Sequence, residues 1–279
     1  MTITVLVTGC ASGFGKKIAR TCWKNGWNVV ATMRAPQKEL DLHPGQKLLL
    51  ERMDVTDPES ISQAFARSRQ RYGTIDAVVN SAGFGGVGVF EQFQPDEIVK
   101  MFETNVFGAM NVMREALPEM RAAGEGTIVN VTSLAGYMGL PGNSVYSASK
   151  YALVGLTEAM AMEYALLGVR IFSVAPGAYT QTGFARAANV RTDQGDDQIS
   201  ELARSLQARK QAAQSSSETV RTEFPDPQEV ADHVYSCLVS NQPIHTPSGR
   251  DAVAMFNRME SQSRQSFLNK IEEMLVPNN

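Results

Sequence analysis

Short hydrophobic runs alternate with longer stretches of helical periodicity along the first two thirds of the chain. Six runs are rich in β-branched residues and too short for helices: 3–8, 28–33, 47–54, 75–80, 127–132 and 169–174. Between them, apolar residues recur every three or four positions, as in helices that bury one face. Strand–helix repeats without a linker predict one α/β domain, in which a parallel sheet is covered by helices on both faces.

Local signals place several helix boundaries. Asp57 followed by Pro58 is typical of an N-cap and a first helical residue, and it predicts a helix that runs to about Tyr72. A long helical span is expected over 95–123, where Pro118 predicts a kink or a break.

The chain becomes polar between about residues 185 and 223. Apolar residues still recur at helical spacing at Ile199, Leu202 and Leu206, so we expect an amphipathic helix between two flexible connections. A turn over 243–249 and one final helix are expected after it.

The predicted architecture is a single Rossmann-like doubly wound parallel sheet in three α/β/α layers. We expect residues 1–279 to form one domain, with a variable substrate-loop segment at about 178–223 and a final helix over 251–275.

Composition and charge exclude several functional classes. The chain is 43% hydrophobic with a net charge of −3, which argues against disorder and offers no basic surface for nucleic acid. Neither a bilayer-spanning apolar run nor a signal peptide is found in the sequence. Three cysteines without metal-ligand spacing predict neither a disulfide framework nor a metal site, and a cytoplasmic location is expected.

Three glycines stand between the first predicted strand and the first predicted helix. Gly9, Gly13 and Gly15 would let a pyrophosphate approach the backbone, and the helix N-terminus would supply free N–H groups to it. Cys10 in this loop is expected to be a small packing residue. A nucleotide is therefore expected at this junction.

Position 34 bears on the choice of nucleotide. An acidic residue at the end of the second strand binds the ribose 2′-hydroxyl of NAD, whereas an arginine there accommodates the 2′-phosphate of NADP. This chain has Arg34, so NADP(H) is favoured over NAD(H).

A tyrosine and a lysine occur four residues apart at the start of a predicted helix. This spacing places Tyr146 and Lys150 on one face, where the ammonium group is expected to lower the tyrosine pKa and make it a usable acid and base. Ser133 follows the fifth predicted strand, at the sheet edge where open α/β folds bind ligands.

Together these motifs resemble the short-chain dehydrogenase/reductase family, in the single-domain branch with a Thr-Gly-x-x-x-Gly-x-Gly loop and Tyr-x-x-x-Lys. The resemblance rests on seven motifs in order over about 170 residues: Thr8 to Gly15 with Ser12 and Phe14, Asp54-Val55, Asn80-Ser81-Ala82-Gly83, Asn105, Ser133, Tyr146 with Lys150, and Pro176-Gly177.

The resemblance implies a role for each of these residues. Tyr146 would be the proton donor and acceptor, and Ser133 would bind the same substrate oxygen. Lys150 would bind the nicotinamide ribose, and Asn105 would hold a water that links it to solvent. The other motifs would bind the cofactor. The family's usual threonine position after Gly177 is occupied by Gln181, so Thr180 or Thr182 would take its place, and Tyr179 is also assigned to cofactor binding.

The predicted activity is interconversion of a ketone or aldehyde and an alcohol by hydride transfer, on an apolar small-molecule substrate. Apolar residues after Gly83, in the loop 134–144 and in the segment 178–223 suggest an apolar substrate.

The wide apolar surface of the helix after Tyr146 favours a homo-oligomer, a dimer or tetramer. Two alternatives are a non-catalytic NADP-sensing regulator, which would not need the Ser/Tyr/Lys set, and a sugar-nucleotide epimerase, which usually has a larger C-terminal domain.

Overall fold

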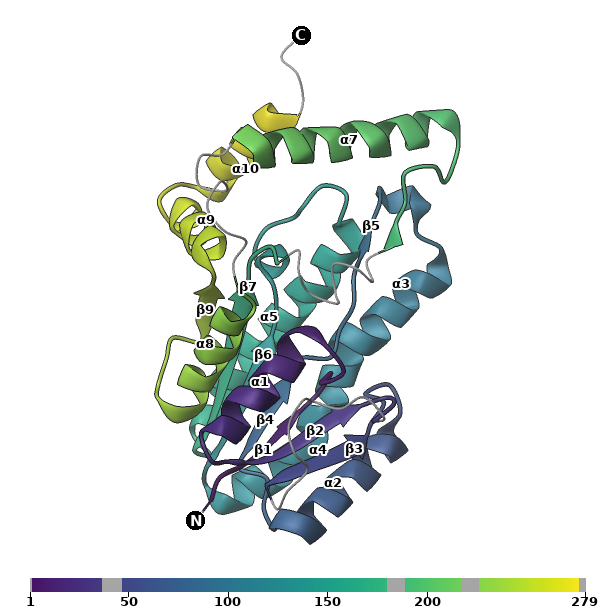
Figure 1. Cartoon of the computed structure of the whole chain (residues 1–279). Coiled ribbons are helices and arrows are strands. Elements are labelled where there is room, and N and C mark those ends of the chain that lie inside the picture. Colours follow the sequence, from purple (N-terminus) through teal and green to yellow (C-terminus); the bar gives the residue numbers. More distant parts are fainter. Residues whose placement is uncertain (1, 37–46, 180–188, 217–225, 276–279) are drawn as a thin grey trace.

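The computed structural model describes residues 2–36, 47–179, 189–216 and 226–275. Seven parallel strands form its main sheet (Figure 1). Their order across the sheet is β3-β2-β1-β4-β6-β7-β9. Six of them coincide with the predicted runs: β1 Thr4–Val7, β2 Asn28–Met33, β3 Leu48–Arg52, β4 Ala77–Asn80, β6 Gly126–Val131 and β7 Val169–Pro176. The predicted α/β three-layer fold is confirmed.

The seventh strand lies where the sequence predicts only a turn. β9, His245–Ser248, pairs with the end of β7, with Pro247 beside Ala175. Proline has no N–H to donate, and it is tolerated here because β9 is the edge strand of the sheet. The four residues of β9, two of which have hydroxyl side chains, show no hydrophobic pattern, so the local sequence did not predict this strand.

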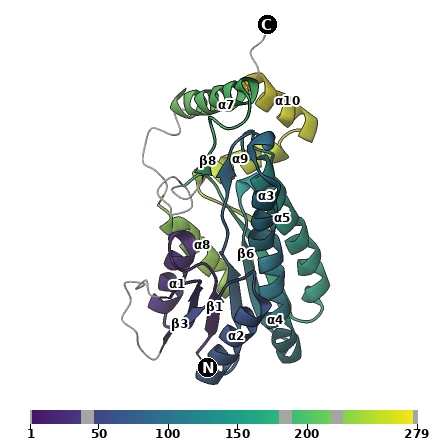
Figure 2. The ribbon, with the colours of Figure 1, turned by 90° about the vertical axis from the view of Figure 1, so that its right-hand side faces the viewer.

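Helices cover both faces of the sheet (Figure 2). Successive strand residues point to opposite faces: Val5 and Val7 belong to one buried cluster and Leu6 to the other. The first cluster includes residues of α1 and α8, and the second includes residues of α2, α4 and α5. The bounds of these helices are α1 Gly13–Lys24, α2 Pro58–Tyr72, α4 Gly108–Ala123, α5 Ser144–Ala165 and α8 Gln228–Val239.

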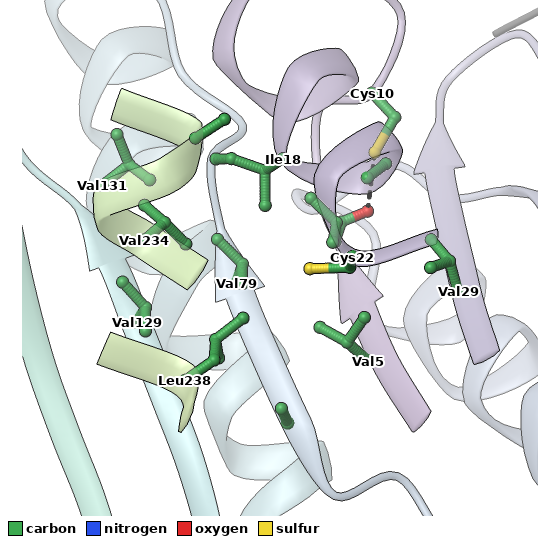
Figure 3. Close-up of a cluster of buried hydrophobic side chains, with 14 of the residues drawn as sticks. Val5, Cys10, Ile18, Cys22, Val29, Val79, Val129, Val131, Val234 and Leu238 are labelled. Carbon is green, nitrogen blue, oxygen red and sulfur yellow. Dashed lines mark hydrogen bonds between the residues drawn. The ribbon is translucent and has the colours of Figure 1, made fainter. Parts of the chain in front are cut away.

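Figure 3 shows the first cluster, which lies beneath α1 and α8. Ile18 and Cys22 of α1 pack with valines of the strands, and Val234 and Leu238 of α8 close the other side. All of these side chains are almost fully buried. Burial of this kind anchors the start of α1 and thereby fixes the glycine loop before it.

The long span 95–123 differs from its prediction. α3, Pro95–Phe102, passes through a single π-helical turn, Glu103–Phe107, into α4. Pro118 lies inside α4 and does not end it. Buried residues on both sides of Pro118, Leu117 and Met120 among them, keep α4 packed against the sheet. Of the predicted kink or break at Pro118, the break is therefore wrong, and the helical irregularity of this span is the π-helical turn that contains Asn105.

The C-terminal part contains more elements than expected. The expected last helix is two helices, α9 Arg250–Glu260 and α10 Arg264–Leu275. The amphipathic helix predicted in the polar segment is confirmed as α7, Asp197–Ser216. Before it, β8 (Asn189–Val190) pairs with β5 (Gly86–Val87) in a small second sheet. The described helices include none that is both long and apolar enough to cross a membrane.

Candidate active site

The glycine loop is shaped by backbone constraints that only glycine satisfies. Gly9 and Gly13 have positive φ angles of 73° and 59°. A Cβ atom on Gly15 would lie 2.5 Å from the Gly9 carbonyl oxygen. The Thr8 hydroxyl accepts hydrogen bonds from the backbone N–H groups of Ser81 and Ala82, at 2.9 Å each. These contacts hold the loop against the carboxyl end of β4.

A dinucleotide pyrophosphate fits the chemistry of this loop. Ser12 is the N-cap of α1 and its side chain makes no capping hydrogen bond. The first N–H groups of a helix have no partner within the helix and lie at its positive end, which favours an anion. Phe14 of this loop is packed edge-to-face against Tyr179, with ring centroids 5.2 Å apart.

Cys10 in the same loop is fully buried, and its thiol lies 3.2 Å from the Val7 carbonyl oxygen. Burial strongly raises the pKa of this thiol. The side chain therefore stays protonated and packs under the loop, as expected from the sequence.

Ser133, Tyr146 and Lys150 lie together at the carboxyl edge of β6. Ser133 follows β6 as the N-cap of a short 3-10 turn, Leu134–Gly136, and Tyr146 and Lys150 lie in the first two turns of α5. The Lys150 ammonium donates to the Val131 carbonyl oxygen at 3.0 Å and lies 5.9 Å from the Tyr146 ring centroid.

The pKa values of the pair are governed by burial. Burial raises the pKa of Tyr146 to about 12, and a hydrogen bond with Ser133 opposes this shift. Burial lowers the pKa of Lys150 to about 8. The expected lowering of the Tyr146 pKa by Lys150 is thus not observed in the protein alone, because desolvation of the phenolate is the larger effect. The Tyr146 hydroxyl is protonated at neutral pH.

Asn105 lies in the π-helical turn between α3 and α4. Its side-chain oxygen accepts from the Phe84 N–H at 3.0 Å, and its amide donates to the Phe84 carbonyl oxygen and to the Ser149 hydroxyl. A Cβ on Gly83 would lie 3.0 Å from the Asn105 side-chain oxygen and 3.7 Å from Lys150 Nζ. The turn thus places Asn105 beside Lys150, and π turns often mark functional sites.

The Pro176-Gly177 motif ends β7 and is held by the C-terminal part of the chain. Asp251 accepts a hydrogen bond from the Ala178 N–H at 2.7 Å, and Gly177 N–H donates to the Ser248 carbonyl oxygen. A Cβ on Gly177 would lie 2.1 Å from the Asp251 carboxylate. Asp251 was not singled out in the sequence, because its contact with this motif depends on β9.

Tyr179 packs into the first buried cluster, where its hydroxyl donates to the Ser248 carbonyl oxygen at 3.4 Å. Tyr179 therefore packs within the core, and its contact with the cofactor stays a prediction. Thr180 and Thr182 lie outside the described residues.

The residues expected to contact adenosine lie at the carboxyl ends of β2 and β3. Arg34 is exposed, and Asp54 accepts hydrogen bonds from the Thr56 N–H and hydroxyl. Partial burial opposes a lower pKa for Asp54, but these hydrogen bonds and the charges of Arg34 and Arg52 lower it overall. Val55 is buried, and a Cβ on Gly108 would lie 2.6 Å from its side chain.

Asn80 lies at the end of β4, between the glycine loop and the Ser133 turn. It is buried, and its amide donates to the side-chain oxygen of Asn130 at 2.9 Å. Asn130 in turn donates to Thr157 of α5 at 2.9 Å. This polar network joins β4, β6 and α5 beneath the site, so it fixes α5 relative to the sheet.

A cavity of ≈ 200 Å³ lies between the small second sheet, the loop before α5 and α7. Most of its lining is apolar: Val87, Gly88, Val89, Pro141, Gly142, Val190, Ala203 and Leu206, with Arg191 and Gln207. Arg191 is buried, pairs with Glu97 at 2.6 Å and stacks on Phe93 at 4.4 Å. No sequence pattern indicated Arg191, because it is an isolated cation in a polar segment.

Comparison with known proteins agrees with this geometry. A sequence profile described as short chain dehydrogenase matches residues 3–194. The chain belongs to the short-chain dehydrogenase family. A 3-ketodihydrosphingosine reductase of Bacteroides thetaiotaomicron is 35% identical over 204 residues, covering 72% of this chain and 74% of that protein.

Two solved structures are also similar to the structure of this short-chain dehydrogenase. A short-chain dehydrogenase from Streptomyces avermitilis has a TM-score of 0.80 and 31% identity, covering 98% of this chain and 97% of that one. ElxO with NADP bound has a TM-score of 0.70 and 26% identity, covering 88% and 97%. The protein is accordingly an NAD(P)-dependent oxidoreductase of this family.

Proposed function

We propose that this short-chain dehydrogenase interconverts an apolar ketone or aldehyde and the corresponding alcohol, with NADP(H) as hydride carrier and Tyr146 as acid and base. The observation that carries the proposal is the convergence of Ser133, Tyr146 and Lys150 at the sheet edge that also presents the glycine loop. A bound nicotinamide would supply or accept the hydride, and the protein would supply position and electrostatics.

The protonation state of Tyr146 suits the reduction direction. With a pKa raised by burial to about 12, the phenol carries a proton at neutral pH, as an ordinary phenol does, and it can donate this proton to a carbonyl oxygen. The Ser133 hydroxyl would hydrogen-bond the same oxygen and stabilise the charge that develops on it. Lys150, held by Val131, would bind the nicotinamide ribose, and a water at Asn105 would connect it to solvent.

The substrate proposal rests on the apolar lining of the ≈ 200 Å³ cavity. Its walls are formed by the segments after Gly83, before α5 and along α7, the regions that the sequence assigned to the substrate. The related 3-ketodihydrosphingosine reductase carries a name that specifies a ketone, which agrees with carbonyl reduction. A panel of ketones and alcohols of increasing chain length, followed by NADPH and NADH absorbance, tests both proposals.

Tyr146→Phe tests the acid and base role directly. Removing the hydroxyl takes away the proton donor and leaves the ring packing, so turnover should fall by at least about 10²-fold while NADPH affinity stays near wild type. The matched control is Tyr235→Phe, which removes a hydroxyl from a ring packed on Trp27, away from the site. Retained turnover in Tyr146→Phe would contradict the mechanism.

The NADP preference rests on Arg34, which is exposed at the end of β2 with no carboxylate at that position. Arg34→Leu should weaken NADPH binding and leave NADH binding nearly unchanged, as measured by fluorescence titration of both cofactors. Lys24→Leu, at the far end of α1, controls for the loss of one surface cation. Equal losses for both cofactors would count against a 2′-phosphate contact.

A homo-oligomer is proposed from exposed apolar residues of α5, of its C-terminal cap and of the π-helical turn before α4. Phe107, Met162 and Leu166 are 52%, 61% and 92% exposed. Burial of such side chains between subunits would remove apolar surface from water. Size-exclusion chromatography with light scattering decides the question, and a monomer at micromolar concentration would refute the proposal.

A further inference from the structure

A chain of hydroxyl groups passes behind the turn that presents Ser133. The Ser173 hydroxyl lies 2.8 Å from Thr132 Oγ1 and 2.8 Å from the Tyr137 hydroxyl. Thr132 directly precedes Ser133, and Tyr137 directly follows the turn Leu134–Gly136. Ser173 is fully buried in β7. Its hydroxyl therefore bridges the two ends of the turn and closes it from behind.

The hydroxyl chain continues to the protein surface. The Tyr137 hydroxyl lies 2.8 Å from His245 Nδ1, and His245 Nε2 lies 3.4 Å from the carboxylate of Glu158, a side chain that is 56% exposed. β9 contributes His245 and α5 contributes Glu158, so the chain joins two elements on either side of the turn.

Tyr137 is fixed by its ring and backbone as well as by its hydroxyl. Its ring packs against Phe256 of α9, with centroids 4.6 Å apart, and edge-to-face against His245. Arg264 of α10 donates to its carbonyl oxygen at 2.8 Å. Burial raises the pKa of Tyr137 to about 12, so the side chain remains a neutral hydroxyl. A neutral hydroxyl can accept a hydrogen bond from one neighbour and donate one to the other, in either direction.

The protonation of His245 decides which way the hydroxyls point. A neutral imidazole protonated on Nε2, toward Glu158, accepts from Tyr137, which accepts from Ser173, which accepts from Thr132. An imidazole that carries a proton on Nδ1 donates it to Tyr137, and each hydroxyl then points in the opposite direction. In that direction Thr132 donates to the Val174 carbonyl oxygen, at 3.0 Å.

The second arrangement uses every short contact of the chain, whereas the first leaves the Thr132–Val174 contact without a proton. Among the described residues, the titratable groups that contact the imidazole are Tyr137, from the turn, and Glu158, from α5. Arg264 faces Tyr137 from α10.

We propose that Tyr137 and His245 are positioning residues for Ser133: they hold its turn closed through Ser173. The inference rests on the proposed role of Ser133 and adds control from a histidine outside the reacting atoms.

The residues Ser173, Tyr137 and His245 are called the clamp, because they are proposed to hold the Ser133 turn closed. Hydrogen exchange tests the clamp independently of activity. The reporter amides are those of Ala135, Gly136 and Tyr137, which bond to Ser133 Oγ, Ser133 O and Leu134 O. In Tyr137→Phe their exchange should quicken about fivefold, because one buried hydrogen bond of the clamp is lost. Tyr235→Phe should leave it unchanged. Exchange in Tyr137→Phe equal to that in Tyr235→Phe would overturn the proposal.

The contribution of His245 is tested by two substitutions. His245→Ala removes the imidazole that lies 2.8 Å from the Tyr137 hydroxyl, so exchange of the reporter amides should quicken about fivefold. His245→Asn keeps a polar amide near that hydroxyl and should exchange more nearly as wild type does. Unchanged exchange in His245→Ala would refute the role of His245.

Activity measurements connect the clamp to the reaction. With NADPH and a ketone that wild type reduces, Tyr137→Phe should lower kcat about fivefold, with the NADPH dissociation constant unchanged because the glycine loop lies beyond β4. Unchanged kcat would overturn the link to Ser133. If wild type reduces no ketone, the proposed function fails, and the exchange data alone decide whether the clamp exists.

Discussion

Gly15→Ala is the substitution for which the structure gives the most direct expectation. The new Cβ atom would lie 2.5 Å from the Gly9 carbonyl oxygen and 2.8 Å from that of Thr8, both backbone atoms. The loop and the start of α1 must separate by at least about 0.5 Å to relieve this contact. α1 is anchored by fully buried Ile18 and Cys22, so the strain falls on the loop.

Two magnitudes follow from this geometry. Overpacking of this kind costs about 1–3 kcal/mol of unfolding free energy, or roughly 2–10 °C in Tm for a protein of this size. Displacing the loop also misplaces the N–H groups proposed to bind the pyrophosphate, and a shift of this order can weaken such an interaction about 10- to 100-fold.

Calorimetric titration with NADPH and thermal unfolding measure both effects. The matched control is Gly155→Ala, in the exposed middle of α5, where an added Cβ meets no atom within 4 Å. Alanine is the better helix former, so this control should raise stability by about 0.5–1 kcal/mol and leave NADPH affinity unchanged. If Gly15→Ala binds NADPH as tightly as wild type at an unchanged Tm, the reasoning about the loop is wrong.

Further predictions concern Lys150 and Asp251. Burial lowers the Lys150 pKa to about 8, below its usual 10.5, so the unfolded chain binds more protons than the folded one between these pH values. The stability of wild type relative to Lys150→Met should therefore rise as pH increases from 8 to 10.5, measured by urea unfolding; a flat or falling difference would contradict the assigned pKa. Asp251→Ala removes the acceptor of the Ala178 N–H and should weaken NADPH binding about 5- to 20-fold. Arg250→Ala, which leaves that hydrogen bond in place, is its control in the same titration, and equal affinities for both variants would argue against this role of Asp251.

Much of the catalytic machinery was predictable because its geometry is local. Tyr146 and Lys150 share a helix face by their spacing alone, and the glycine loop lies where a strand turns into a helix. Local spacing could not predict the pKa values. The pKa of Tyr146 depends on how much water the folded chain removes from its hydroxyl, and burial proved the larger effect.

Contacts between distant segments were not predictable in the same way. β9 is a strand only because β7 offers it a free edge, and its position brings His245 to Tyr137 and Asp251 to Ala178. None of these pairs has a sequence pattern, since the partners are 70 or more residues apart.

The alternation of strands and helices, the glycine loop and the Ser/Tyr/Lys set follow from periodicity and short spacings, which act within one or two turns of chain. How these parts are held depends on contacts between distant segments. Burial shifted the pKa values of Tyr146 and Lys150, and packing of the C-terminal elements on β7 set the supports of Ser133 and Gly177. Desolvation and long-range hydrogen bonds depend on the whole fold, so no local pattern encodes them.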